Sequence, residues 1–250
     1  MKSTVEQIRQ RFDNDVERFS NLETGQTATV DARLCMDLVA AAVAAVSPDA
    51  KDLLDIGCGA GNYTLCVLEE LAAESGAAGM PPVDCTLVDL SRPMLDRAVE
   101  RVSLRTSGSV HAIQGDMRAI DFGEKAFDVI VTAATLHHLR TDEEWRAMFA
   151  KIFRALRPGG SFWVFDLIEQ VHPAIESLMR DRYAEYLEAL KGSGDAGKAY
   201  REAVFKYVAE EDTPKPVTYQ LRLMREAGFT DEELLHKNVL FAAFGARRPM

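Results

Sequence analysis

The stretch Leu53-Leu-Asp-Ile-Gly-Cys-Gly-Ala-Gly61 decides the fold of this chain. A short apolar run leads directly into three glycines at alternate positions, and residues 61–74 then read as a helix. Glycines at such a turn let the backbone bend tightly and let a ligand lie against the main chain without Cβ clashes. The N–H groups that open the helix would face that ligand, so the pattern predicts a site for a nucleotide or nucleoside. The alternative interpretation is a strand-to-helix turn that is glycine-rich for structural reasons alone.

Apolar runs and helical stretches alternate along the next hundred residues. The candidate strands after residues 53–56 are 83–89, 109–114, 127–132 and 161–167, and the candidate helices between them are 91–105 and 141–156. Strands that are apolar throughout, alternating with helices, indicate a parallel sheet covered on both faces. Residues 233–246 hold two strand-like runs with a very short connection, which is typical of antiparallel strands. We therefore expect an α/β fold with a doubly wound, mostly parallel sheet and an antiparallel C-terminal strand.

We expect a single domain with four parts. They are a helical N-terminal cap (1–50), a core (51–167), an inserted helical lid (168–215) and a C-terminal helix with a β-hairpin (216–250). In the cap, apolar residues recur every three or four positions from Val5 to Phe19, which predicts one amphipathic helix. A polar break at 20–27 and a second helix at 30–46 follow. The lid consists of helices 173–190 and 199–211 with a linker at 191–198.

Charge and composition exclude several classes of protein. The chain has 29 Lys and Arg against 39 Asp and Glu, a net charge of −10, which disfavours both nucleic-acid binding and docking on anionic lipid. The longest apolar run, Leu38–Val46, is far shorter than the roughly 20 residues that span a bilayer. The four cysteines form no C-x-x-C pair and the five histidines have no zinc-site spacing, so we expect reduced thiols, no metal and a cytoplasmic location.

Acidic residues follow two further candidate strands. Asp89 ends the strand at 83–89, where a carboxylate can accept both hydroxyls of a ribose, although a solvated loop acid would look the same. Asp116 follows the strand at 109–114 and could accept a hydrogen bond from an exocyclic amine, while Met117 could cover a flat base. An isolated loop Asp is more often a turn residue. Together with the glycine turn, the two acids predict a site for a nucleoside.

Taken together, these motifs resemble the class I S-adenosylmethionine-dependent methyltransferases. The resemblance rests on five segments, DIGCGAGNYT (55–64), LVDLSRPML (87–95), QGDMR (114–118), FDVIVTAATLHHL (127–139) and LRPGGSFWVFD (156–166). It implies a Rossmann-like sheet of six parallel strands and one antiparallel strand. It also implies S-adenosyl-L-methionine as the cofactor and S-adenosyl-L-homocysteine as its product. Arg157–Gly160 resembles the family's turn into the fifth strand.

The resemblance also assigns site residues. It implies that the methionine part of the cofactor is lined by Asp55, Gly57, Cys58 and Gly59. The ribose would be held by Asp89 and Leu90, and the adenine by Asp116 and Met117. The amino and carboxylate groups of the methionine would face Thr132 and Ala133.

Methyl transfer from a sulfonium is an in-line displacement in which the protein supplies alignment, and a base is needed only if the acceptor must lose a proton. His137 and His138 follow the fourth strand and are the candidate catalytic residues. The structural alternative is that His138 packs beneath the cofactor and His137 fixes the loop. The chain has no base-methylation motif and no basic stripe, so we expect a small-molecule acceptor.

Three other functions stay open at this point. The tail is similar to carboxy-S-adenosylmethionine synthase-like enzymes, which act on the cofactor itself, and a non-catalytic cofactor-binding protein would keep the same pocket. An NAD-dependent oxidoreductase fits less well, because the glycine pattern is G-x-G-x-G and no Tyr-x-x-x-Lys pair follows. Phe12, Phe19, Tyr183 and Tyr186 could close over the acceptor or simply pack. A homodimer is compatible with the sequence, which does not determine the oligomeric state.

Overall fold

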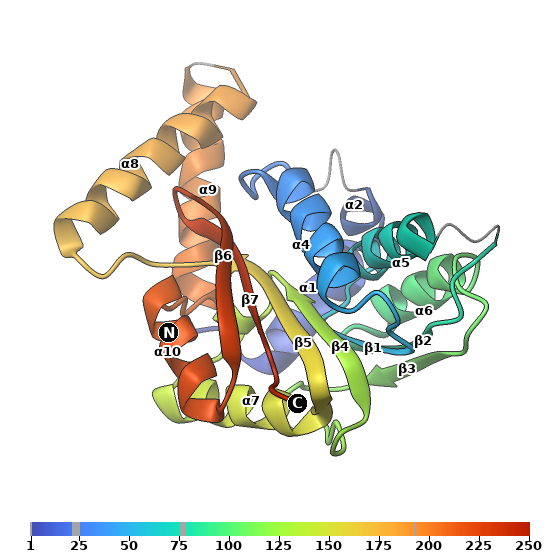
Figure 1. Cartoon of the computed structure of the whole chain (residues 1–250). Coiled ribbons are helices and arrows are strands. Elements are labelled where there is room, and N and C mark those ends of the chain that lie inside the picture. Colours follow the sequence, from blue (N-terminus) through green and yellow to red (C-terminus); the bar gives the residue numbers. More distant parts are fainter. Residues whose placement is uncertain (1, 22–25, 76–78, 193) are drawn as a thin grey trace.

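The computed structural model describes residues 2–21, 26–75, 79–192 and 194–250, and its centre is a seven-stranded sheet flanked by helices (Figure 1). The strand order is β3-β2-β1-β4-β5-β7-β6. The strands are β1 (Asp52–Ile56), β2 (Asp84–Asp89), β3 (Val110–Gln114), β4 (Phe127–Ala133), β5 (Leu156–Leu167), β6 (Thr230–Asn238) and β7 (Phe241–Arg247). The neighbours from β3 to β5 pair in parallel, whereas β7 runs antiparallel to both β5 and β6. The predicted fold class is confirmed.

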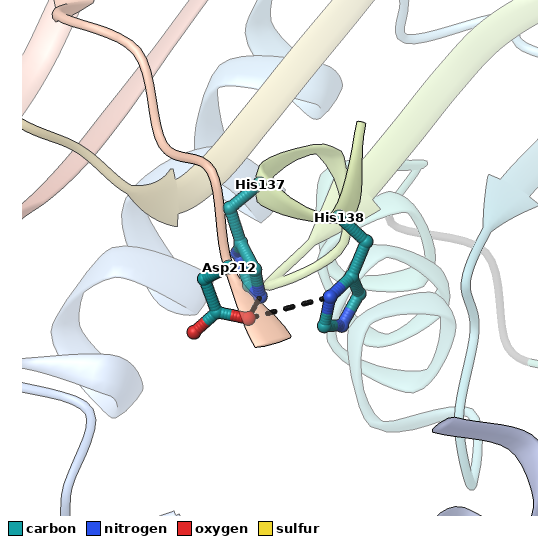
Figure 2. A group of neighbouring side chains, drawn as sticks. All are labelled: His137, His138 and Asp212. Atoms are coloured by element: carbon teal, nitrogen blue, oxygen red, sulfur yellow. Dashed lines mark ion pairs between the residues drawn. The ribbon is translucent and has the colours of Figure 1, made fainter. Parts of the chain in front are cut away.

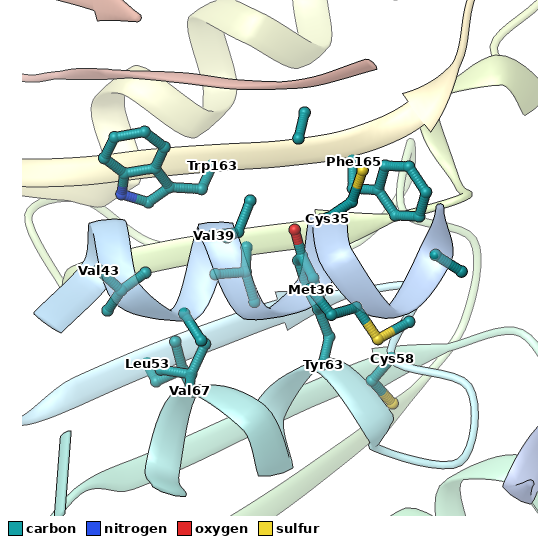
Figure 3. Packing of buried hydrophobic residues seen from close by; sticks show 14 of the residues in the cluster. Cys35, Met36, Val39, Val43, Leu53, Cys58, Tyr63, Val67, Trp163 and Phe165 are labelled. Atoms are coloured by element: carbon teal, nitrogen blue, oxygen red, sulfur yellow. The ribbon is translucent and has the colours of Figure 1, made fainter. Parts of the chain in front are cut away.

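Helices cover both faces of the sheet (Figure 1). On one face lie α4 (Ala32–Val46), α5 (Asn62–Ser75) and α6 (Arg92–Val102), and on the other α7 (Asp142–Ala155) and α10 (Val217–Ala227). Figure 3 shows the first face, where Val39 and Val67 pack over Leu53. The next strand residue, Leu54, belongs to the cluster on the opposite face, and both leucines are buried. Because the central strands β1, β4 and β5 are buried on both faces over most of their length, their sequences are largely apolar without alternation, whereas β3 and β6 are mostly exposed.

The N-terminal helix is broken where the sequence predicts one continuous helix. Its two parts are α1 (Val5–Asn14) and α2 (Val16–Ser20), separated by Asp15, whose φ of −112° and ψ of 17° are not helical. Thr4 begins α1 with a capping box that includes Gln7. The prediction of one helix was therefore wrong at Asp15. Part of the polar break predicted at 20–27 lies outside the described residues.

The predicted lid is a helical hairpin that extends away from the sheet (Figure 1). It consists of α8 (Pro173–Leu190) and α9 (Asp195–Glu211), so α9 begins four residues before the expected helix at 199–211. The linker is correspondingly shorter, and its residue 193 lies outside the described residues. Two tyrosines of α8 hold the segment before α4: the Tyr183 hydroxyl donates to the Ala28 carbonyl at 2.8 Å, and the Tyr186 hydroxyl donates to the Thr27 carbonyl at 2.7 Å.

The expected turn at Arg157–Gly160 is instead a bulge inside β5. Leu156 pairs with Phe127 and Ser161 pairs with Val129, so the residues between them loop out of register. A Cβ at Gly160 would lie 2.8 Å from the Asp128 carbonyl oxygen, which explains why glycine is needed there. None of the described helices is long and apolar enough to cross a membrane.

Candidate functional site

A cavity of about 290 Å³ opens where the carboxyl ends of the central strands meet the N-terminal helices. Its floor is formed by the loops after β1, β2, β3 and β4, and its outer wall comes from α1 and α2. This position at the carboxyl edge of a parallel sheet is where open α/β folds bind ligands. The wall residues are mainly apolar and include Val5, Ile8, Phe12 and Phe19.

The glycine turn shows where a ligand fits. Gly57, Gly59 and Gly61 have φ values of +72°, +51° and +81°, a region that side chains rarely adopt. A Cβ at Gly57 would lie 2.2 Å from Thr135 Oγ1, so this glycine is required by packing. A Cβ at Gly59 would meet no atom within 4 Å, although Gly59 lines the cavity. The open space above Gly59 therefore lets a ligand approach the main chain.

Asp89 is fixed to this turn by main-chain hydrogen bonds. Its Oδ2 accepts from the Gly59 N–H and its Oδ1 from the Ser91 N–H, both at 2.8 Å. Burial raises the pKa of Asp89 to about 6, although these N–H groups act in the opposite direction. Each oxygen retains a lone pair for a further donor. Asp89 is therefore a preorganised acceptor at the cavity floor.

Asp55 is a buried acid that carries an unused acceptor. Its carboxylate is 1% exposed, and its Oδ2 accepts a hydrogen bond from Thr64 Oγ1 at 2.7 Å. Its Oδ1 has no hydrogen-bond partner among the described residues. Burial raises the pKa of Asp55 to about 7. Because Asp55 lines the cavity, a cationic group of a ligand could satisfy this oxygen.

Asp116 is paired within the protein. The Arg118 guanidinium binds both of its oxygens, with Nη2 donating to Oδ2 at 2.6 Å, and Arg118 Nη1 reaches Glu144 at 3.0 Å. Burial acts to raise the pKa of Asp116, but the Arg118 contacts outweigh it and hold that pKa below its usual range. Sequence reasoning missed Arg118, although the Asp-x-Arg spacing was a visible signal.

The structure brings most of the predicted cofactor residues together. Nine of them line the cavity: Asp55, Gly57, Cys58, Gly59, Asp89, Leu90, Asp116, Met117 and Ala133. Thr132 does not, because its hydroxyl donates to the Ile56 carbonyl at 2.8 Å and ties β4 to β1. Neighbouring side chains of a strand point to opposite faces, so Ala133 faces the cavity and Thr132 is buried. Of the other proposed closing residues, Phe12 and Phe19 line the cavity, with ring centroids 5.4 Å apart, whereas Tyr183 and Tyr186 do not.

The two candidate catalytic histidines meet an acid from the lid (Figure 2). They lie in the short helix η1 (Leu136–His138) after β4, and Asp212 directly follows α9. His137 Nε2 lies 3.5 Å and His138 Nδ1 lies 3.3 Å from Asp212 Oδ1. On its other side, His137 Nδ1 bonds to the Asp166 carboxylate, and the His137 main-chain N–H donates to Asp166 Oδ2 at 3.1 Å. Only His138 lines the cavity; His137 lies behind it.

Burial and neighbouring charges shift the pKa values of His137, His138 and Asp212 in different directions. Burial alone would lower the pKa of His137, but Asp166 and Asp212 raise it to about 9. Burial raises the pKa of Asp212 to about 6. Burial together with the neighbouring His137 lowers the pKa of His138 well below its ordinary value. The cluster therefore holds its two imidazoles in different electrostatic environments.

Arg140 places a cation at the same end of the cavity. Its Nη1 donates to the Glu211 carbonyl and to Thr213 Oγ1, the latter at 3.2 Å. Its Nη2 has no hydrogen-bond partner among the residues described. Arg140 and Asp212 could not be selected from the sequence, because only the fold brings residues from the end of α9 to the loop after β4.

Comparison with known proteins relates this chain to methyltransferases. A family described as a methyltransferase domain matches residues 53–160. An O-methyltransferase (cnsE) of Penicillium expansum is 27% identical over 182 residues, which covers 72% of this chain and 61% of the relative. A demethylmenaquinone methyltransferase of Lactococcus lactis is 25% identical over 185 residues, covering 72% and 66%. The chain thus matches less than two thirds of the length of either relative.

A solved structure matches the chain from end to end. The [4+2]-cyclase SpnF superposes with a TM-score of 0.64 at 16% identity and covers 100% of this chain and 98% of its own. At this identity the likeness shows the fold alone. The fold therefore extends over the N-terminal helices and the lid as well as the sheet.

Proposed function

We propose that the chain is a class I S-adenosylmethionine-dependent methyltransferase that transfers the methyl group of S-adenosylmethionine to a small-molecule acceptor. The observation that carries this proposal is the open space at Gly59 in a cavity that is also lined by the buried Asp55 and the half-buried Asp89. A nucleoside with a cationic amino-acid tail satisfies both acids at once. Asp89 would accept the ribose hydroxyls, and Asp55 would face the ammonium group of the methionine.

The remaining cofactor contacts follow from the cavity lining. Leu90 and Met117 provide apolar surface for the adenine, while Asp116 is shared with Arg118 and would offer its remaining lone pairs to the exocyclic amine. Gly57 and Cys58 line the methionine part, together with Ala133 on β4. We assign no cofactor contact to the Thr132 side chain, because its hydroxyl is bonded to Ile56. The cofactor supplies the reactive methyl group, and these residues hold it in line with the acceptor.

The acceptor would lie at the end of the cavity where α1 meets η1. Ile8, Phe12 and Phe19 form apolar walls there, and His138 and Arg140 are the polar groups that face inward. His138 lies against Phe12, with ring centroids 6.2 Å apart. These walls favour a largely apolar acceptor with one polar group. We assign contact with the acceptor to His138 and a positioning role to His137, which lies behind it.

Net charge and fold support the choice of a small molecule. The chain carries a charge of −10, which opposes binding to nucleic acid, and the enclosed apolar wall suits a compact ligand. The four cysteines form no disulfide bond with one another, which is compatible with the cytoplasmic location that we propose.

The test begins with calorimetry of S-adenosylhomocysteine on the folded protein, followed by turnover of S-adenosylmethionine against a panel of phenols, amines and carboxylic acids. We expect binding in the wild type, and a loss of affinity of about 10- to 100-fold in Asp89→Asn. Asp96→Asn, an exposed acid on α6, is the matched control and should bind normally. Mass spectrometry of both cofactor and acceptor distinguishes methyl transfer from a change in the cofactor alone. Folded protein that binds neither cofactor nor product would refute the proposal.

A further inference from the structure

We propose that His137, His138 and Asp212 form a binding site for one divalent first-row transition-metal ion at the acceptor end of the cavity (Figure 2). The ligand atoms are His137 Nε2, His138 Nδ1 and Asp212 Oδ1. Two neutral imidazoles and one carboxylate are a donor set that suits Zn²⁺, Fe²⁺, Co²⁺ or Mn²⁺. Binding of the metal does not depend on the proposed methyl transfer.

The distances match those between ligands of one ion. All three atoms lie within 4.8 Å of one another, and Oδ1 of Asp212 is 3.5 Å and 3.3 Å from the two imidazole nitrogens. Metal–ligand bonds of roughly 2.0–2.2 Å place adjacent ligands about 3.0–3.5 Å apart. The third edge, between the two imidazoles, needs at most a small rotation of the rings. Two of the three separations therefore already have the length that one ion requires, and the third must close from at most 4.8 Å.

Two of the three ligand atoms make no hydrogen bond to the residues described. His138 Nδ1 and Asp212 Oδ1 are buried atoms without a hydrogen-bond partner among the residues described. They are 3.3 Å apart, yet they form no hydrogen bond with each other. The Asp212 side chain is only 2% exposed, so leaving its oxygen unpaired is costly. An ion between the two atoms would satisfy both.

The third ligand is oriented from behind, as metal-binding histidines usually are. His137 Nδ1 is held by the Asp166 carboxylate, whose other oxygen accepts the main-chain N–H of His137. A proton shared on the Nδ1 side leaves the Nε2 lone pair directed at the cluster. Such an outer carboxylate fixes the ring and strengthens the ligand. Asp166 is 1% exposed, so the arrangement is rigid.

The nearby cations are engaged with other atoms. Arg140 and Lys2 donate to the main-chain carbonyls of Glu211 and Asp212, and Arg11 pairs with the Glu211 carboxylate at 2.5 Å. None of these three contacts involves Asp212 Oδ1. The carboxylates of Asp166 and Asp212 then supply two negative charges beside a divalent ion. The alternative is that His137 Nε2 carries a proton and no metal binds, in which case His137 and Asp212 form an ion pair.

The metal would also be reachable from the cavity. His138 lines the cavity and its side chain is 14% exposed, so coordination positions on that side are open to a ligand. If the proposed methyl transfer holds, an oxygen of the acceptor could bind there, and the ion would act as a Lewis acid. No spacing rule for metal sites would find this set, because the two histidines are adjacent and Asp212 comes from the end of the lid.

The test is a titration of the chelator-treated full chain with Co²⁺, without cofactor, followed by absorption and by metal analysis. We expect one Co²⁺ per chain with ligand-field absorption, and displacement by Zn²⁺. Asp212→Asn and His138→Gln should each weaken Co²⁺ binding at least tenfold, and Asp166→Asn about 10- to 100-fold. His111→Gln, which removes an exposed imidazole on β3, is the matched control and should bind Co²⁺ as the wild type does.

Two results would overturn the site. One is no uptake of Co²⁺ by the wild type, which leaves the protonated ion pair as the role of the cluster. The other is equal uptake in the wild type and in His138→Gln, which indicates adventitious surface binding. Calorimetry of S-adenosylhomocysteine on the same samples reports whether each variant is folded. It also separates the two proposals, because the residues assigned to the cofactor and the three metal ligands are different, so that cofactor can bind whether or not the metal does.

Discussion

The main-chain N–H of Gly59 donates to the carboxylate of Asp89 at 2.8 Å, which joins the glycine turn after β1 to the tip of β2. The same carboxylate accepts the N–H of Ser91, the N-cap residue of α6. Three elements are thus fixed by one side chain before any ligand binds. A site that is organised in advance loses little conformational entropy on binding.

Two glycines of this turn should respond differently to substitution. Gly57→Ala should destabilise the fold, since its Cβ would clash with Thr135 Oγ1, and its melting temperature should fall by several degrees. Gly59→Ala has open space and should fold with a smaller loss, about 1 kcal/mol for its positive φ. Its Cβ would occupy the ligand's space, so affinity for S-adenosylhomocysteine should fall more than tenfold. Thermal melting and calorimetry measure the two effects, and normal affinity in folded Gly59→Ala would contradict the assigned position of the cofactor.

Cofactor affinity should fall on acidification. The pKa of Asp89 is raised to about 6 and that of Asp55 to about 7, both mainly by burial. The ionised forms are the better partners for ribose hydroxyls and for an ammonium group, so affinity should decrease as pH drops from 8 to 5. The decrease approaches tenfold per pH unit for each group that must lose its proton to bind. Calorimetry of S-adenosylhomocysteine across this range tests it, and a flat profile would show that neither acid contacts the ligand.

Asp55→Asn should stabilise the protein without ligand while it weakens binding. A carboxyl whose folded pKa is raised favours the folded state below its unfolded pKa of 3.8, and this stability is lost as pH rises through about 7. An uncharged amide avoids that loss, so at pH 8 the variant should unfold at a higher temperature than the wild type. Its affinity for S-adenosylmethionine should fall, because a neutral amide attracts the ammonium group of the methionine less strongly than a carboxylate does. A variant less stable at pH 8 would mean that the ionised carboxylate is compensated by a contact other than Thr64.

His138→Ala should reduce turnover roughly a hundredfold once an acceptor is known, while affinity for S-adenosylhomocysteine stays within a few-fold of the wild type. This split is expected because His138 lines the acceptor end of the cavity, away from the glycine turn. His111→Ala is the control for loss of an exposed imidazole. Unchanged turnover in His138→Ala would remove His138 from the reaction.

The parts of the fold that depend on local pattern were predictable, and those that depend on distant contacts were not. The strand, glycine turn and helix at 53–74 follow from apolar runs and glycine spacing. The break at Asp15 has no local signal, because the apolar stripe continues through it. The orientation of Thr132 depends on where β4 ends, and the pairing of Asp212 with the two histidines depends on how the lid folds back.

The break at Asp15 has a consequence for engineering. It turns α1 and α2 so that the N-terminal side chains Val5, Ile8, Phe12 and Phe19 cover the cavity, while the sheet and its loops form the floor. Residues 2–20 therefore contribute an apolar wall of the cavity but no strand of the sheet. Exchanging this segment between homologues would reshape selectivity and leave the cofactor floor in place.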